Sequence, residues 1–292
     1  MTMSFTNATP LLGDPAALRR QARETGYLFL RNVVDADLVR DLRRGIFGIL
    51  ADFGCLDARA QPDDGIIAAE WLSNREDFYG SGVPERVYTR IQQLEALHRF
   101  PHQPRLVALQ DALLGEPAIV HPGLIGRIIL PDGFATPPHQ DFVHTGGSPR
   151  TWTCWVPLGD VDRQLGSLSI FAGSHRNGLY PTKPKSHGGM EAIVPETAED
   201  WAEGDFAIGD LLVFSGLTVH RALPNHSGNR VRLSVDFRFQ PQSEPIAENC
   251  LRPHGNNQQW DGVYAGWQQT DLQYYWQKHD AGALGREAVP AG

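Results

Sequence analysis

Apolar residues change their spacing along this chain near Pro117. Before that position they recur three or four residues apart in several stretches, which is typical of amphipathic helices packed on a sheet. The elements predicted in this part are helices over residues 14–24, 35–54 and 104–114 and a strand over residues 27–30. Residues 54–90 carry a mixed, polar pattern that does not decide between helix and loop.

After Pro117 the apolar residues come in short runs separated by Gly, Pro, Asp and Asn. Several short strands with frequent turns predict a β-sandwich or barrel. The predicted strands cover residues 124–130, 151–158, 167–171, 210–214 and 231–239. No internal repeat or Gly/Ser linker separates the two parts, so we expect a mainly β fold in which helices buttress a β core.

We therefore expect one domain over residues 1–292, with a helical part at about 14–116, a β core at about 117–241 and an extension at 242–292. The extension carries aromatic residues in a polar background, which favours docking on the domain's own core. A lid or a self-association surface is the alternative. The aromatic residues are Trp260, Tyr264, Trp267, Tyr274, Tyr275 and Trp276.

Composition and charge narrow the classes of partner. The 292 residues have a formal net charge of −8, which argues against a nucleic-acid surface because phosphate binding needs a basic footprint. No apolar run is long enough for a membrane span, and the N-terminus lacks the pattern of a secretory signal. The three scattered cysteines suit reduced thiols. We expect a cytoplasmic monomer or homodimer that acts on a small molecule.

The chemistry is concentrated in His139-Gln140-Asp141 and the distant His220. Two imidazoles and one carboxylate are the ligand set of a mononuclear non-haem iron(II) site. If a short strand carries His139 and Asp141, both side chains project to the same face and Gln140 points away. In a chain with 11 histidines, about one His-x-Asp tripeptide is expected by chance, so its meaning depends on the rest of the chain.

A second polar pattern follows His220. Arg230, Arg232, Ser234 and Asp236 alternate with apolar residues and share one face of a predicted strand. One interpretation is an exposed edge face with an arginine–aspartate pair. The other is a receptor for a carboxylate, because the planar guanidinium group matches carboxylate geometry.

These residues resemble the phytanoyl-CoA dioxygenase family. The resemblance covers roughly residues 26–241 and rests on an ordered set of motifs. The family consists of iron(II)- and 2-oxoglutarate-dependent oxygenases with a double-stranded β-helix, that is, a cupin-like jelly-roll core. The motifs, in order, are His139-x-Asp141, Gly166-Ser167-Leu168, Gly173-Ser174-His175, Gly209-Asp210, His220 with Pro224-Asn225, and an arginine about ten residues later.

The resemblance implies that His139, Asp141 and His220 bind iron. The arginine for 2-oxoglutarate matches Arg230 by distance, whereas Arg232 and Ser234 form the Arg-x-Ser pattern of related oxygenases. The preceding turn differs by one residue from the usual length, so both arginines stay candidates, with Arg230 preferred. Thr153 is expected to help hold the same carboxylate. These residues are the expected cofactor site.

The implied reaction consumes O2 and 2-oxoglutarate, releases succinate and CO2, and hydroxylates an unactivated C–H bond, with ascorbate as a stimulant. Because Asp141 is present, halogenation is not expected, since the family's halogenases lack this carboxylate. Desaturation, epoxidation or ring formation is the alternative. Within the family the chain is most similar to bacterial hydroxylases that tailor terpenoid natural products. A cupin-like metal isomerase or a non-catalytic jelly-roll binding protein are the competing classes.

Four further residues are candidates for the substrate pocket. Arg127 either pairs with a carboxylate of substrate or cosubstrate or forms a structural ion pair. His144 follows the iron motif closely and suits the mouth of the pocket. Phe142 and Trp152 either line the pocket or belong to the ordinary core.

Overall fold

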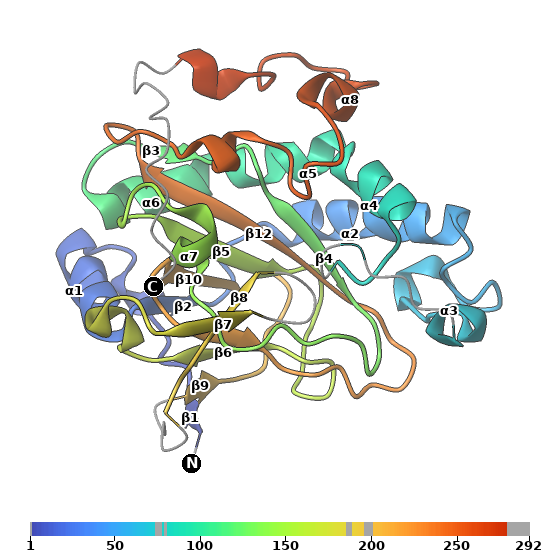
Figure 1. The fold of residues 1–292 in the computed structure, drawn as a ribbon, viewed down its shortest axis with the longest axis horizontal. Helices are drawn as coiled ribbons and strands as arrows, with labels where there is room; N and C mark the ends of the chain where they lie inside the picture. Colours follow the sequence, from blue (N-terminus) through green and yellow to red (C-terminus); the bar gives the residue numbers. More distant parts are fainter. Residues whose placement is uncertain (1, 74–77, 79–80, 185–188, 196–200, 279–292) are drawn as a thin grey trace.

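The central layer of the fold is a six-stranded sheet in the order β2-β10-β5-β12-β3, with β4 also paired to β12. The computed structural model describes residues 2–73, 78, 81–184, 189–195 and 201–278 (Figure 1). All the pairings in this sheet are antiparallel. The strands are β2 (Tyr27–Leu30), β3 (Ala118–Val120), β4 (Ile125–Ile129), β5 (Trp152–Pro157), β10 (Leu211–Ser215) and β12 (Arg232–Pro241).

A second sheet faces the first, in the order β1-β9-β6-β11. Its strands are β1 (Met3–Ser4), β6 (Leu168–Phe171), β9 (Trp201–Glu203) and β11 (His220–Ala222), and β7 (Thr182–Pro184) pairs with β8 (Met190–Ala192) beside it. Apolar side chains from both sheets, including Trp155, Ile170 and Phe214, form one cluster between them. The two sheets therefore enclose an interior, as in a sandwich or barrel.

Helices cover the other face of the six-stranded sheet. The odd-numbered residues of β12, such as Leu233, Val235 and Phe237, pack with buried residues of these helices in a second, larger cluster. Figure 1 shows α2 and α6 along this side of the sheet. The helices are α1 (Pro15–Thr25), α2 (Ala36–Asp52), α3 (Ala69–Ser73), α4 (Glu85–Gln92), α5 (Glu95–Arg99) and α6 (Pro104–Leu114).

The even-numbered residues of β12 point the opposite way because side chains alternate along a strand. They are polar, and all are buried: Arg232, Ser234, Asp236, Arg238 and Gln240. A buried polar face on a central strand is unusual unless its groups are paired or bind a ligand. The face is not the exposed edge that one reading of the sequence suggested.

The C-terminal extension docks on the helical side. Trp260 and Tyr264 of α8 (Trp260–Tyr264), together with Trp276, pack in one cluster with Ile119 of β3. His98 of α5 lies between Trp260 and Trp267, at ring-centroid distances of 5.9 and 5.3 Å. Figure 1 shows α8 beside α5, far from the second sheet. The described part of the extension is thus packed on the domain's own core, as expected.

The elements predicted from the pattern are confirmed, with small shifts at their ends. Asp14 and Asp35 accept hydrogen bonds from the first backbone amides of α1 and α2, and Gly115 ends α6 with a positive φ of 79°. The short strands β1, β3, β7, β8, β9 and β11, of two or three residues each, lie outside the predicted strand ranges. The undecided stretch 54–90 holds α3 and most of α4 among its described residues.

All three cysteines are buried, and none of them forms a disulfide bond in the part of the chain that the structure describes. No helix in the described ranges has both the length and the apolar character needed to cross a membrane.

Candidate active site

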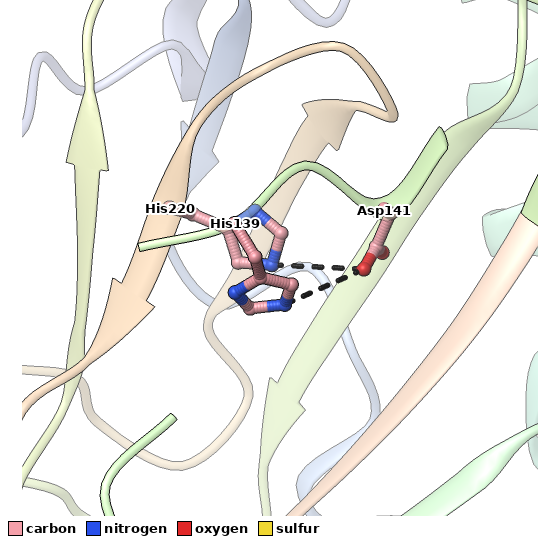
Figure 2. Close-up of side chains that lie close together, drawn as sticks. All are labelled: His139, Asp141 and His220. Carbon is pink, nitrogen blue, oxygen red and sulfur yellow. Dashed lines mark ion pairs between the residues drawn. The ribbon is translucent and has the colours of Figure 1, made fainter. Parts of the chain in front are cut away.

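His139, Asp141 and His220 meet at the open end of the interior between the sheets. Their ligand atoms all lie within 4.8 Å of one another, and all three residues are buried. The Oδ1 atom of Asp141 is 3.7 Å from Nε2 of His139 and 3.8 Å from Nε2 of His220 (Figure 2). These three atoms can therefore converge on one metal ion.

Both imidazoles are oriented by backbone carbonyls. Nδ1 of His139 lies 2.9 Å from the Pro137 carbonyl oxygen, and Nδ1 of His220 lies 3.1 Å from that of Thr218. A ring that donates from Nδ1 keeps Nε2 unprotonated, which is the form that binds a metal. The same contacts fix the plane of each ring before any ion arrives.

The Asp141 carboxylate is held through its other oxygen. Oδ2 accepts a hydrogen bond of 2.7 Å from Thr153 Oγ1 and two from Arg238, 3.2 Å from Nε and 3.0 Å from Nη2. Thr153 and Arg238 lie directly opposite each other on β5 and β12. With Oδ2 engaged in three hydrogen bonds, Oδ1 is the oxygen available to a metal.

The charges of this group keep Asp141 ionised. Burial of the Asp141 carboxyl opposes its ionisation, but Arg238, His220 and His139 outweigh burial and hold the pKa of Asp141 well below its usual range. Burial also lowers the pKa of His220, although Asp141 partly opposes this shift. A carboxylate and a neutral imidazole are the protonation states that a metal site requires.

The prediction that one short strand carries both His139 and Asp141 is wrong. His139 forms an isolated antiparallel bridge with His220, through hydrogen bonds of 2.9 and 3.0 Å between their backbones, and Asp141 begins the short helix α7 (Asp141–Thr145). The alternation still holds because the backbone of Gln140 is extended, with φ −118° and ψ 126°.

Gln140 points away from the ligands, as the alternation predicts. Its amide nitrogen donates to the carbonyls of Gly178 and Leu217 at 2.8 and 2.7 Å, and its carbonyl accepts from the Tyr180 amide at 2.8 Å. The buried Gln140 side chain thereby ties the motif to two other loops. The middle residue of the motif thus positions the ligands without touching the site.

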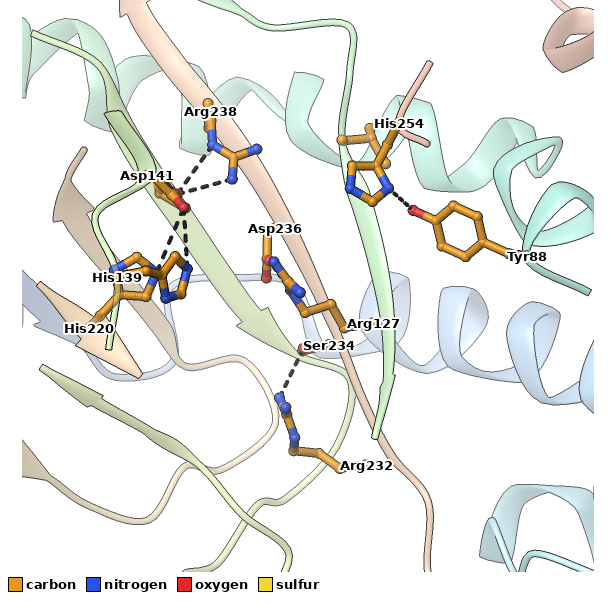
Figure 3. Close-up of polar contacts among 12 residues, drawn as sticks. Tyr88, Arg127, His139, Asp141, His220, Arg232, Ser234, Asp236, Arg238 and His254 are labelled. Carbon is orange, nitrogen blue, oxygen red and sulfur yellow. Dashed lines mark hydrogen bonds and ion pairs between the residues drawn. The ribbon is translucent and has the colours of Figure 1, made fainter. Parts of the chain in front are cut away.

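Arg232 lies on the same inner face of β12 as Arg238. It is 1% exposed, its Nη1 donates to Ser234 Oγ at 3.0 Å, and its Nε and Nη2 have no partner among the described residues. Burial lowers the pKa of Arg232 to about 10. Figure 3 shows Arg238, Asp236, Ser234 and Arg232 in this order along β12. The Arg232 guanidinium thus keeps two buried nitrogens whose hydrogen-bonding capacity is not met by the described residues.

Arg230 lies elsewhere. Its side chain is 45% exposed and stands 3.7 Å from Asp162, and it lines a surface groove with Arg43 and Asp160. The structure does not bring Arg230 together with the three metal-ligand candidates.

A cavity of about 270 Å³ opens beside His139 and Asp141. The C-terminal extension supplies part of its wall through Asn249, Cys250, Arg252 and His254. The remaining described residues of the wall are His121, Gly123, Ile125, Arg127, Phe134, Thr136, His144, Thr145, Gly189 and Arg238.

Of the four candidate substrate residues, the structure places two in the wall of the cavity and two elsewhere. His144 lines the cavity, with its ring centroid 6.2 Å from that of His139. Arg127 also lines it and forms an ion pair with Asp236. Trp152 packs on the helical side of the sheet instead. Phe142, which donates its backbone N–H to the Gly216 carbonyl, is not among the cavity residues.

Sequence reasoning missed Arg238 and the contribution of the extension. Arg238 continues the alternation of Arg232, Ser234 and Asp236 on β12, so the pattern contained the signal. Residues 249–254 carry no motif that points to the cavity.

Comparisons with known proteins agree with this geometry. The family model described as phytanoyl-CoA dioxygenase (PhyH) matches residues 22–233. The curated relatives include two proteins named 1-deoxypentalenic acid 11-beta-hydroxylase. The one from Streptomyces exfoliatus is 27% identical over 276 residues, and the one from Streptomyces arenae is 29% identical over 272 residues. Both alignments cover 85% of this chain and 89% of the relative.

Among solved structures, the epimerase SnoN in complex with Fe3+, alpha ketoglutarate and nogalamycin RO has a TM-score of 0.54 and 21% sequence identity. The alignment covers 80% of this chain and 87% of SnoN. This likeness shows a shared fold, and it confirms the jelly-roll core that the sequence predicted.

Proposed function

Because this chain belongs to the phytanoyl-CoA dioxygenase family, we propose that it hydroxylates an unactivated C–H bond of a small organic molecule in the biosynthesis of a terpenoid-like natural product. The protein is an oxygenase that depends on iron(II) and 2-oxoglutarate. The observation that carries the proposal is the convergence of His139, Asp141 and His220 beside a cavity of about 270 Å³.

The donor set fits iron(II). Two neutral imidazole nitrogens and one carboxylate oxygen occupy three positions and leave the others for small molecules. When bound, iron(II) supplies the redox chemistry that couples the reduction of O2 and the decarboxylation of 2-oxoglutarate, to succinate and CO2, with oxidation of the substrate. Asp141 contributes one negative charge through Oδ1, while Thr153 and Arg238 hold Oδ2.

Arg232 is the residue we assign to the distal carboxylate of 2-oxoglutarate. Its Nε and Nη2 are buried without a partner among the described residues, and a carboxylate would accept from both, with Ser234 beside it. A buried, unpaired guanidinium destabilises a protein unless a ligand compensates the charge. Arg230 lies at the surface beside Asp162, so its charge does not need a ligand to compensate it.

Hydroxylation is favoured over the alternatives for two reasons. Asp141 is present, so no coordination position is vacated for a halide. The two relatives with the highest coverage given above bear names of a hydroxylase that acts on a terpenoid acid. Desaturation and ring formation would instead leave the substrate without added oxygen, so product mass separates them from hydroxylation. Epoxidation also adds one oxygen atom and is recognised by the loss of a C=C bond in the product.

The test follows succinate and product mass. Purified protein is incubated with iron(II), ascorbate, 2-oxoglutarate and a panel of terpenoids, and the matched control is His139→Ala. We expect succinate above the control with at least one substrate and a product heavier by one oxygen atom. Succinate no greater than that of His139→Ala across the panel contradicts the proposal. Substrate conversion without a need for 2-oxoglutarate would indicate a cupin-like isomerase instead.

A further inference from the structure

Two arginines reach the cavity from neighbouring strands on the inner face of the six-stranded sheet. Arg127 comes from β4 and Arg238 from β12, which pair with each other. Both line the cavity that contains His139 and Asp141. Their side chains are 19% and 10% exposed, respectively, so both guanidinium groups are largely shielded from bulk solvent.

Each arginine uses only part of its guanidinium group for a carboxylate of the protein. Arg127 donates from Nε to Asp236, and Arg238 donates from Nε and Nη2 to Asp141. Nη1 and Nη2 of Arg127 and Nη1 of Arg238 donate to none of the described residues, and none of these atoms is fully buried. These nitrogens therefore remain as hydrogen-bond donors toward the cavity.

The charges on this inner face do not balance. Arg127, Arg232 and Arg238 face two carboxylates, those of Asp141 and Asp236, which leaves one positive charge in excess (Figure 3). Iron(II) adds two positive charges and 2-oxoglutarate two negative charges, so the loaded site keeps the same excess. In a partly dehydrated cavity this excess favours one monoanionic ligand.

Arg252, His121 and His254 of the wall add no net charge near pH 7, and for His254 the reason is that burial lowers its pKa to about 3. Arg252 pairs with Glu248 on its own segment. Burial lowers the pKa of His121 to about 4, so this histidine is neutral near pH 7. The rest of the described wall contains apolar side chains such as Ile125 and Phe134, which suit a hydrophobic body.

We propose that the substrate is an apolar molecule with one carboxylate, and that Arg127 and Arg238 anchor this carboxylate beside the iron site. The inference rests on the proposed function, because it names the substrate class of the same cavity. In this arrangement Arg232 binds 2-oxoglutarate. Arg127 and Arg238 orient the substrate so that its apolar body extends past the iron site. Anchoring one end of the substrate would fix which C–H bond is presented for oxidation.

The test compares apolar monocarboxylic acids with their methyl esters. Binding of cyclohexanecarboxylate, monocyclic and bicyclic terpenoid acids and the matching esters is measured by calorimetry, without O2, on protein loaded with iron(II) and 2-oxoglutarate. We expect at least one acid to bind about tenfold or more tightly than its ester. Equal affinity of acid and ester in every pair, or no binding by any acid, overturns the inference.

Variants of Arg127 test whether this arginine causes the tighter binding of the acid than of its ester. Arg127→Gln should reduce the preference for the acid to about threefold or less. The double variant Arg127→Gln with Asp236→Asn removes the same hydrogen-bond donors but keeps one positive charge in excess, so it should lower the preference less than the single variant does. It leaves no buried, unpaired carboxylate, which guards against a folding defect. Arg230→Gln, at the surface, is the control and should keep the preference. An unchanged preference in both Arg127 variants overturns the assignment.

A separate spectroscopic measurement distinguishes a failure of this inference from a failure of the proposed function. The visible absorption of an iron(II)–2-oxoglutarate complex is recorded before any acid is added. If this absorption is absent, the proposed function fails, and the comparison of acids with esters is run on the metal-free protein, which carries the same charge excess. If the absorption is present and acids and esters bind equally, only the present inference fails.

Discussion

Each candidate iron ligand is held by a second contact that the sequence motif does not contain. Backbone carbonyls orient His139 and His220, and the side chains of Thr153 and Arg238 hold Asp141. Such contacts select the protonation state of a ligand and its direction, and their loss typically weakens metal binding 10–100-fold.

Arg238 offers the clearest test of this support. Arg238→Gln should lower the affinity for iron(II) about tenfold or more, because Asp141 loses a charged partner and two hydrogen bonds to Oδ2. The affinity is measured by anaerobic titration with a competing chelator. Arg252→Gln is the control, since Arg252 lines the same cavity but pairs with Glu248. Equal iron affinity in Arg238→Gln and the wild type would show that Arg238 does not position Asp141.

The two candidate arginines for 2-oxoglutarate predict opposite results. Arg232→Gln should raise the KM for 2-oxoglutarate by about 100-fold, because the ligand carboxylate loses a buried charged partner. Arg230→Gln should leave this KM within about twofold, since Arg230 is exposed beside Asp162. Steady-state kinetics at varied 2-oxoglutarate give both values.

A control for folding is available at the same position. Arg232→Met should not lower the unfolding free energy of the ligand-free protein, because it removes a buried charge that lacks a carboxylate partner. A large KM effect in Arg230→Gln, with none in Arg232→Gln, would reverse the assignment.

The sequence located the candidate iron ligands more sharply than the candidate arginine for 2-oxoglutarate. Alternation around Gln140 was enough to place His139 and Asp141 on one side, although only the first belongs to a β-bridge. The choice between Arg230 and Arg232 depends on where β12 begins. That register is set by long-range pairing: Arg230 bridges to Ile66, and Arg232 pairs with Ile129. Neither contact is visible in the local pattern.

At the scale of elements, the extension and helix α5 are joined through His98. The His98 ring is 7% exposed, and its Nε2 lies 2.8 Å from the Gln92 carbonyl oxygen. Trp260 and Trp267 flank the ring. Because residues 249–254 also line the cavity, the docking of the extension determines the shape of the substrate site.

His98 should make this docking sensitive to acid. Burial lowers the pKa of His98 to about 4, although the Gln92 carbonyl partly opposes the shift. The folded state therefore prefers the neutral ring, and below about pH 6.5 the unfolded chain binds the proton first. The stability due to His98 is complete above that pH and is lost as the pH falls toward 4.

Between pH 7 and pH 5 the loss from His98 should be about 2 kcal/mol. The unfolding free energy is measured at both pH values by urea unfolding of the metal-free protein. Its decrease from pH 7 to pH 5 should be smaller by that amount in the His98→Gln variant than in the wild type. The difference between the two proteins isolates His98 from the other buried histidines. A pH dependence identical in both would contradict the account.

For the whole molecule, the sequence predicted the layers but not the closure of the interior. Long runs such as 211–215 and 232–241 are apolar or strictly alternating, and so they were visible as strands. The second sheet contains β6, which the sequence predicted, but its other strands have only two or three residues and are too short for a periodic signal. β11 was missed for this reason, although it carries His220.

The same limit applies to the cavity. Its wall combines residues around β3, β4 and α7 with residues 249–254 of the extension, which follow α7 by more than 100 residues in the sequence. The β core and the family motifs predicted that such a site exists, whereas its charge excess became visible only when the structure placed Arg127 and Arg238 in the wall of the same cavity as His139 and Asp141.

The central claim is that iron(II) and 2-oxoglutarate bind together at His139, Asp141 and His220. The most direct measurement is anaerobic titration of the iron(II) protein with 2-oxoglutarate while the visible charge-transfer absorption of the complex is recorded. The account predicts a saturable absorption in the wild type, its loss in His139→Ala, and a shift to much higher 2-oxoglutarate concentrations in Arg232→Gln. No absorption in the wild type, or equal absorption in His139→Ala, would contradict the account.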